Sequence, residues 1–263
     1  MKKRRYIARS RKGVYVLPNL FTSMNLFCGF YSIVSSINGK MEHAAVAIFV
    51  AILFDIMDGK VARLTHTTSR FGIEYDSLAD LVSFGLAPSL MIYLWALVPM
   101  GRLGWLAAFL FTVCGALRLA RFNSMVDEGA TDFTGLPIPG AAAMTATTLL
   151  LCTRTSVSFE NYPLIPMIML YALSFLMVSN IRYYSFKKYS VFKKFSFNVL
   201  VACILVLIFI ASEPPIALFI IAFLYTLSGP LGVLWRIRKR TSAEETSSEA
   251  ETPEEENTPK PLE

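Results

Sequence analysis

The sequence has few of the residues that build soft metal sites or disulfide frameworks. It contains two histidines and four cysteines, and no two cysteines are spaced as CxxC. Because the cysteines (Cys28, Cys114, Cys152 and Cys203) lie in or near apolar runs, we interpret them as packing residues without a disulfide or metal role. Aspartate is also scarce, since the chain has six, and four of them lie between residues 55 and 80. A site made from titratable side chains is therefore expected to consist mainly of carboxylates.

Between the basic residues 1–13 and residue 240, the chain is dominated by long apolar runs. Hydrophobic residues make up 54% of the chain, and about eight runs approach the roughly 20 residues that cross a bilayer core. Their approximate centres are residues 27, 51, 86, 113, 147, 172, 204 and 224. Prolines 88, 137 and 139 interrupt or flank the third and fifth runs. This pattern predicts an all-α, polytopic membrane bundle of about eight transmembrane helices and excludes an ordinary soluble domain.

The positive charges predict how the chain is oriented. If the N-terminus is inside and the chain crosses eight times, 22 of the 25 Lys and Arg residues lie inside. Since Lys and Arg favour cytoplasmic flanks, we expect a multi-pass protein of the cell (inner) membrane with both termini in the cytoplasm. We expect a basic segment over residues 1–13 and a membrane domain over 14–237. The segment 238–263 is rich in glutamate and poor in apolar residues, which predicts a disordered acidic cytoplasmic tail.

The four clustered aspartates form two pairs with helical spacing. Asp55 and Asp58 are three residues apart, and Asp76 and Asp80 are four apart, so each pair shares one helix face. The loop between them is short and polar, which predicts two antiparallel helices whose carboxylates face each other at the cytoplasmic edge. Because a charge at the bilayer centre costs about 2.5–3.5 kcal/mol, such acids are expected to be functional. Converging carboxylates repel one another, and Mg²⁺ or Mn²⁺ would relieve this repulsion and could also hold a substrate phosphate.

These aspartates belong to a longer pattern, Asp55-x2-Asp58-Gly59-x2-Ala62-Arg63-x8-Gly72-x3-Asp76-x3-Asp80. At every fixed position it resembles the signature of the CDP-alcohol phosphotransferase family. The resemblance implies a six-helix catalytic core that transfers a phospho group from a CDP-linked donor to an alcohol and releases CMP. It also implies two Mn²⁺ or Mg²⁺ ions, with metal ligands at Asp55, Asp58, Asp76 and Asp80. Asp80 would in addition act as the general base.

The resemblance also implies which residues bind the donor. The signature residues expected to do so are Gly59, Ala62, Arg63 and Gly72. The glycines and the alanine would leave room for the nucleotide, and Arg63 would bind the donor phosphate. We expect Thr22 and Asn25, together with Asn19, to lie near the nucleotide as well, although helix capping and interhelical hydrogen bonding would also explain them.

Four flanking stretches narrow the resemblance. They are LPNLFTSMNLFCGF (17–30), CGALRLARFN (114–123), FTGLPIPGAA (133–142) and SNIRYYSFKK (179–188). Together they look like the phosphatidylserine synthases of the integral-membrane type, over roughly residues 14 to 235. This similarity implies CDP-diacylglycerol as the donor, L-serine as the acceptor, and a homodimer in the membrane.

Serine carries a carboxylate, so a selective site needs a cation. Arg118 and Arg121, with Asn123 as a polar partner, are the candidates, because arginine pairs with carboxylates in a bidentate manner. The alternative is that both arginines anchor the end of a helix at the cytoplasmic face. Arg182, Lys187 and Lys188 could bind an acceptor or lipid phosphate, or could form a basic loop at the head groups (these candidates lie within residues 179–188).

Two other functions remain open from the residues. The same chemistry could serve another acceptor, such as glycerol 3-phosphate, inositol phosphate or an amino alcohol. An ion-coupled transporter could use the aspartates as a cation path, but it would spread carboxylates along the membrane midplane. The clustering at one edge favours the transferase.

Overall fold

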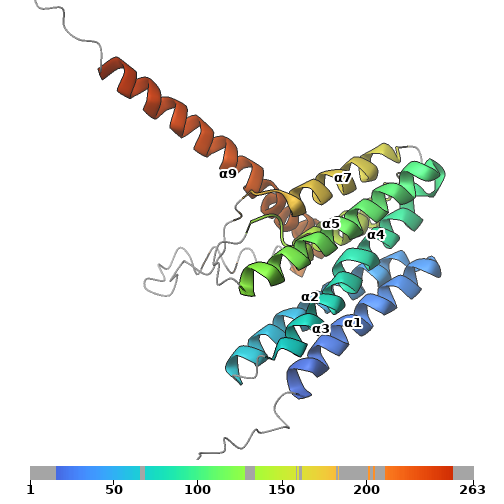
Figure 1. The fold of residues 1–263 in the computed structure, drawn as a ribbon. Helices are drawn as coiled ribbons and strands as arrows, with labels where there is room; N and C mark the ends of the chain where they lie inside the picture. The colour runs from blue at the N-terminus through green and yellow to red at the C-terminus, as the bar shows by residue number, and fades with distance from the viewer. Residues whose placement is uncertain are drawn as a thin grey trace, which may run out of the picture.

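The chain folds into helices joined by short turns. The computed structural model describes residues 16–65, 69–127, 134–157, 159, 162–181, 183, 201, 204 and 211–250, and no β-strand occurs in this part of the chain. The elements are α1 (Val16–Ile37), α2 (Met41–Leu64), α3 (Arg70–Asp80), η1 (Leu81–Leu86), α4 (Ala87–Ile92), η2 (Tyr93–Leu97), η3 (Val98–Met100), α5 (Arg102–Asp127), α6 (Ile138–Thr155), α7 (Leu164–Val178) and α9 (Pro214–Ala250). Figure 1 shows α1, α2 and α3 side by side, with α4, α5 and α7 continuing the bundle.

Helix ends near the site follow from local sequence. Gly39 has a φ of +71°, a left-handed conformation that glycine adopts without steric cost, and it turns the chain from α1 into α2. Ser69 is the N-cap of α3, where its hydroxyl accepts a hydrogen bond from the backbone N–H of Gly72 at 3.0 Å. The turn at Gly39 thus reverses the chain between α1 and α2, and the cap at Ser69 starts α3 after the next reversal.

The elements from α3 to η3 form one continuous rod, Arg70–Met100, in spite of two prolines. Each proline follows a π-helical turn by two residues, Pro88 after η1 and Pro99 after η2. In η1 the N–H of Ala87 bonds to the carbonyl of Val82, five residues back. A proline ring clashes with the carbonyl four residues before it, so a wider turn lets the rod continue. The run that we predicted to be interrupted at Pro88 is therefore one helix.

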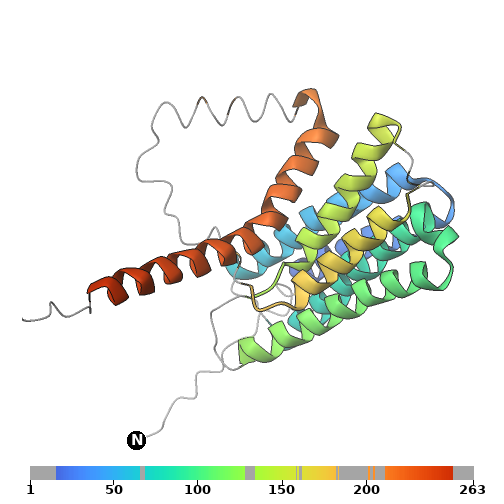
Figure 2. The same cartoon turned by 90° about the horizontal axis from the view of Figure 1, so that it is seen from above.

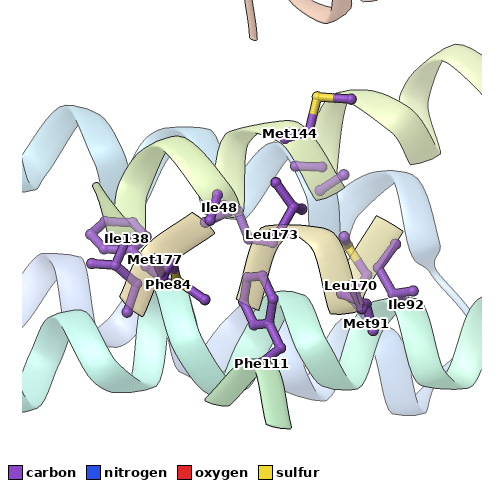
Figure 3. Close-up of a cluster of buried hydrophobic side chains, with 14 of the residues drawn as sticks. Ile48, Phe84, Met91, Ile92, Phe111, Ile138, Met144, Leu170, Leu173 and Met177 are labelled. Atoms are coloured by element: carbon purple, nitrogen blue, oxygen red, sulfur yellow. The ribbon is translucent and has the colours of Figure 1, made fainter. Parts of the chain in front are cut away.

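The hydrophobic core lies where the rod meets α2, α5, α6 and α7. Figure 3 shows Ile48, Phe84, Phe111, Ile138 and Leu173 converging there, together with further buried side chains. Small residues bring the helix backbones close: Gly29 on α1 lies against Ser83, whose hydroxyl donates to the Asn25 carbonyl at 2.9 Å. This packing holds α1 against the rod just beyond Asp80.

The outer faces of the helices are apolar, as a membrane protein requires. Phe27 and Phe30 on α1 are each 61% exposed, and large apolar residues also cover the outer faces of α5 and α9. Among the described residues, four helices are long and apolar enough to cross a membrane: Leu17–Ile37, Arg70–Met100, Arg102–Ser124 and Pro214–Val233. Seven of the eight predicted span centres lie within described helices, and the centre at residue 204 falls in a segment that is almost wholly outside the described residues. The prediction of an all-α membrane bundle is confirmed.

The last helix, α9, packs against α6 and then extends beyond the bundle (Figures 1 and 2). Near its N-terminus, Glu213 pairs with Arg154 at the end of α6, with 3.2 Å between Nη2 and Oε1. Figure 2 shows α9 bent part-way along, and Pro230 is the proline inside it. The helix continues to Ala250. It therefore includes the first part of the segment 238–263, for which the composition predicts disorder. Alanine and glutamate are good helix formers, so the turns after Arg240 can extend a helix that is already nucleated.

Candidate active site

The α2–α3 hairpin brings the predicted aspartates together. Ligand oxygens of Asp55, Asp76 and Asp80 all lie within 4.8 Å of one another. Asp58 lies beside Asp76, within hydrogen-bonding reach of its carboxyl group. The two pairs therefore face each other across the hairpin as their helical spacing predicts.

Helix α1 supplies polar partners for two of these carboxylates. The Thr22 hydroxyl donates to Oδ2 of Asp58 at 3.0 Å, and the Asn25 amide donates to Oδ1 of Asp80 at 2.9 Å. Asp58 is 5% exposed and Asp80 is 8% exposed, so these hydrogen bonds replace water that the carboxylates have lost. Helix α1 thus forms the back wall of the aspartate cluster.

The cluster has the properties of a divalent cation site. Oδ1 of Asp76 is buried and has no hydrogen-bond partner in the part of the chain that the structure describes. Several carboxylates in such close contact repel one another, and the chain places no lysine or arginine in salt-bridge contact with them among the described residues. Carboxylate oxygens are the ligands that Mg²⁺ and Mn²⁺ prefer, so these residues fit a metal of that class.

A cavity of about 450 Å³ opens beside the aspartates. Its walls come from α1, α2, α3 and the end of α5. The predicted donor-binding residues that line it are Thr22, Gly59, Ala62, Arg63 and Gly72, and Asp58 and Asp76 form part of the same surface. The structure therefore collects most of the predicted donor-binding residues around one space that reaches the carboxylates.

The small residues keep this space open. A Cβ atom added at Gly72 would lie 3.2 Å from Oγ of Ser69 and 3.6 Å from Oδ1 of Asn19. A Cβ atom at Gly59 would lie 3.9 Å from Nη2 of Arg63. Side-chain bulk at either position would project toward groups that line the cavity, which explains why glycine suits both positions.

Asn25, which we predicted to lie near the donor, is not among the residues that line the cavity. It is fully buried behind Asp80 and binds that carboxylate through its amide. Its Oδ1 is buried and without a hydrogen-bond partner among the described residues. In this structure Asn25 supports the aspartate cluster, whereas Asn19 and Thr22 face the cavity.

The three predicted acceptor residues occupy different surroundings. Arg118 has a buried Nε without a partner in the described part of the chain, and its guanidinium lies within electrostatic range of Asp80. Asn123 lines the cavity and donates to Ser77 Oγ at 3.0 Å. Arg121 instead donates to Oδ1 of Asn180 at 2.8 Å, after the end of α7. Arg182, Lys187 and Lys188 lie outside the described residues.

Sequence reasoning missed several residues that line the cavity, including Ser69, Ser77 and Phe122. Ser69 had a local signal, because serine before a helix is a common N-cap. Ser77 follows Asp76 directly, and its bond to Asn123 joins α3 to α5. That contact spans 46 residues of sequence, so local spacing gives no indication of it.

Comparison with known proteins agrees with this site. The sequence model of CDP-alcohol phosphatidyltransferases matches residues 15–178. The chain belongs to this family. It is therefore an enzyme that transfers phosphatidyl groups, and it is an integral membrane protein with several apolar helices. Family membership confirms the resemblance and decides against the transporter alternative.

Three relatives within the family show how far the similarity extends. The CDP-diacylglycerol–serine O-phosphatidyltransferase of Helicobacter pylori is 38% identical over 217 residues, which cover 82% of this chain and 90% of that protein. The protein of the same name from Bacillus subtilis is 37% identical over 174 residues, covering 66% and 93%. The archaetidylserine synthase of Methanothermobacter thermautotrophicus is 40% identical over 169 residues, covering 64% and 69%.

Proposed function

We propose that this phosphatidyltransferase is a CDP-diacylglycerol–serine O-phosphatidyltransferase, which transfers the phosphatidyl group to L-serine and releases CMP. The observation that carries the chemistry is the convergence of Asp55, Asp76 and Asp80 beside a cavity of about 450 Å³. Support for the acceptor comes from the relatives, two of which are named for transfer to serine and one for archaetidylserine synthesis.

The cavity is assigned to the nucleotide end of the donor. Arg63 on its wall provides a cation for the diphosphate, and Gly59 and Gly72 leave room for the nucleotide to approach the helix backbones. The acyl chains of CDP-diacylglycerol stay in the membrane. This arrangement lets a lipid donor present its polar end to the carboxylates at the edge of the bilayer.

The aspartates are assigned to two divalent ions, Mn²⁺ or Mg²⁺. Asp55, Asp76 and Asp80 supply oxygens that already lie close together, and Asp58 lies beside Asp76. Bound ions of this class neutralise a diphosphate and make CMP a better leaving group. Oδ1 of Asp76, which is buried without a hydrogen-bond partner among the described residues, supports this assignment most directly.

Asp80 is assigned the role of general base. The Asn25 amide holds its Oδ1 and fixes the orientation of the carboxylate. Asp80 takes the proton of the serine hydroxyl as that oxygen bonds to the phosphorus that carries diacylglycerol. The bond between this phosphorus and the CMP oxygen breaks, and the proton remains on Asp80 until the product leaves.

Arg118 is assigned to the carboxylate of serine. Its Nε is buried without a partner among the described residues, and it lies close to Asp80, where the acceptor hydroxyl must be. A single cation suits an acceptor with one negative charge better than a phosphorylated alcohol, whose dianion needs more. Asn123, at the cavity wall, is placed to orient the donor or acceptor but is already bonded to Ser77.

The proposal includes a location. We place the enzyme in the cell (inner) membrane as a homodimer, with both termini and the aspartate cluster on the cytoplasmic side. The distribution of Lys and Arg along the chain supports this orientation. Serine then reaches the site directly from the cytosol.

The test is CMP release by the purified protein with CDP-diacylglycerol and Mn²⁺. L-serine, glycerol 3-phosphate, inositol 1-phosphate and water are compared as acceptors, with Asp80→Asn alongside. We expect release that depends on L-serine and is lost in Asp80→Asn. Faster release with one of the other acceptors would overturn the serine assignment and leave the family chemistry intact.

A further inference from the structure

A second hollow, the α1–α2 groove, lies on the outer surface of the bundle away from the aspartates. Its volume is about 340 Å³, and the residues that line it are Tyr31, Glu42, His43, Val46, Ala47 and Val50. Glu42 is in the first turn of α2, and Asp58 follows more than four turns later. The two carboxylates are thus about 24 Å apart along the helix axis, at a rise of about 1.5 Å per residue. The groove is therefore separate from the site of transfer.

The groove has a charged end and an apolar end. Glu42, Val46 and Val50 are spaced four residues apart, so they form one stripe along α2. Val46 is 50% exposed, and Val50 is 37% exposed. Ala47 is buried beside this stripe, and its short side chain leaves room at the floor of the groove. The stripe runs about 12 Å along the helix axis, from a carboxylate to exposed aliphatic side chains.

The charged end lies at one boundary of the membrane. Residues Leu17–Ile37 of α1 are long and apolar enough to cross it, and the chain turns at Gly39 just after them. Glu42 and His43 follow in the first turn of α2, and both are exposed. Because head groups lie just outside the apolar core of a bilayer, these two side chains are at head-group level. The valines of the groove lie deeper, at the level of the acyl chains.

The polar groups of the groove are free to bind a ligand. Glu42 and His43 take part in no hydrogen bond or ion pair of their side chains within the part of the chain that the structure describes. Lys40, the N-cap residue of α2, makes no side-chain cap hydrogen bond, so the first backbone N–H groups of the helix also lack a side-chain acceptor. The groove thus offers a carboxylate for a cation and N–H donors for an anion at the same end.

A membrane lipid fits these features better than a second copy of the chain does. The cores of protein–protein interfaces are depleted of charged residues, whereas this groove has Glu42 at one end and no countercharge in salt-bridge contact among the described residues. A phospholipid with an amine has an ammonium, a phosphate and apolar chains in the order in which the groove presents a carboxylate, N–H donors and aliphatic side chains. Charge complementarity therefore identifies the occupant as a lipid of this class.

We propose that the α1–α2 groove binds an amine-bearing phospholipid in the leaflet opposite the aspartates. The Glu42 carboxylate accepts hydrogen bonds from the ammonium, and the ring N–H of His43 donates to the phosphate. An acyl chain lies over Val46 and Val50. An anionic head group without an amine is disfavoured, because the carboxylate repels it. This site is independent of the acceptor that the enzyme uses.

The experiment measures which phospholipid remains bound to the purified full-length protein in detergent, by native mass spectrometry. The protein is incubated with an equimolar mixture of phosphatidylethanolamine and phosphatidylglycerol. We expect the wild-type protein to retain phosphatidylethanolamine about tenfold more than phosphatidylglycerol, as one hydrogen bond to a charged group predicts. Glu42→Gln removes this preference. Ala47→Leu fills the floor of the groove and lowers the retention of phosphatidylethanolamine itself.

The matched control is Glu74→Gln, at an exposed glutamate on α3, and it retains both lipids as the wild-type protein does. A thermal midpoint close to that of the wild type shows that each variant is folded, and Glu42→Gln carries the test if Ala47→Leu does not fold. Equal retention of the two lipids by the wild-type protein overturns recognition of the amine. Unchanged retention in the folded variants overturns the site. A change from dimer to monomer mass in Ala47→Leu with unchanged lipid retention would also overturn it and would assign the groove to an interface between copies.

Discussion

Three of the four aspartates differ in what the neighbouring residues provide for them. Asp58 receives the Thr22 hydroxyl, Asp80 receives the Asn25 amide, and Asp76 keeps a buried oxygen without a partner among the described residues. Identical side chains in one cluster therefore have different remaining capacity for ligands. A carboxylate with a buried oxygen that lacks a partner has much to gain from a cation, and the carboxylate held by an amide has a fixed orientation.

Asn25→Leu tests whether the hydrogen bond from α1 orients Asp80, the proposed general base. Leucine has a similar volume but cannot donate to Asp80, and a buried hydrogen bond to a charged group contributes about 1.5–3 kcal/mol. We expect kcat to fall about tenfold to a hundredfold while the KM for CDP-diacylglycerol stays within about twofold, measured by CMP release. Asn38→Ala, at an exposed asparagine after α1, is the control. A rise in the donor KM with kcat unchanged would instead indicate that Asn25 contributes to donor binding, as the sequence predicts.

At the scale of elements, glycines in α2 and α3 reduce helix stability but give a ligand access to the helix backbones. Glycine inside a helix destabilises it by about 0.5–1 kcal/mol relative to alanine, yet Gly59 and Gly72 lie within these helices and line the cavity. The missing side chains cost helix stability, and in return they leave the space that a ligand needs. Filling this space should therefore lower activity while it changes stability little.

Gly72→Ala tests this expectation. The added methyl raises helix propensity but also crowds Ser69, whose hydroxyl caps α3, so the thermal midpoint should change little; at the cavity it crowds Asn19 as well. One methyl group in a ligand pocket is worth about 1–3 kcal/mol, so we expect the donor KM to rise about tenfold. Gly232→Ala is the matched control, since a Cβ there meets nothing within 4 Å. Equal activity of the two variants would contradict a donor site at Gly72.

The helices and their contacts also show which features of the site the sequence could predict and which it could not. The hairpin and its facing carboxylates were predictable, because helical spacing and a short loop are local properties. The hydrogen bond between Ser77 and Asn123 was not, because it depends on how α5 lies against α3. The role of Asn25 behind Asp80 also depends on tertiary packing, since the two residues are 55 positions apart. Local pattern therefore revealed the reactive groups, and packing decided what supports them.

For the whole molecule, repulsion within the aspartate cluster should make stability depend on divalent cations. A ligand that binds the folded state stabilises it by mass action, and the cluster has no countercharge in salt-bridge contact among the described residues. We expect Mn²⁺ to raise the thermal midpoint of the detergent-solubilised protein by several degrees, and chelation by EDTA to lower it and abolish CMP release. Asp76→Asn should lose most of this shift. A midpoint that is insensitive to Mn²⁺ in the wild-type protein would contradict the metal assignment.

The π-helical turn Leu81–Leu86 begins directly after Asp80 and divides the Arg70–Met100 rod into two halves. Its extra residue sets the rotational phase between them: the first half turns its aspartates toward α2, and the second turns Met91 and Ile92 into the core. Deleting one residue within the turn would restore a regular helix and rotate one half relative to the other by about 100°. The core and the aspartates could then not both keep their places. The first of the two π-helical turns in this rod thus sets the rotation at which the core-facing side chains and the active-site aspartates both reach their partners.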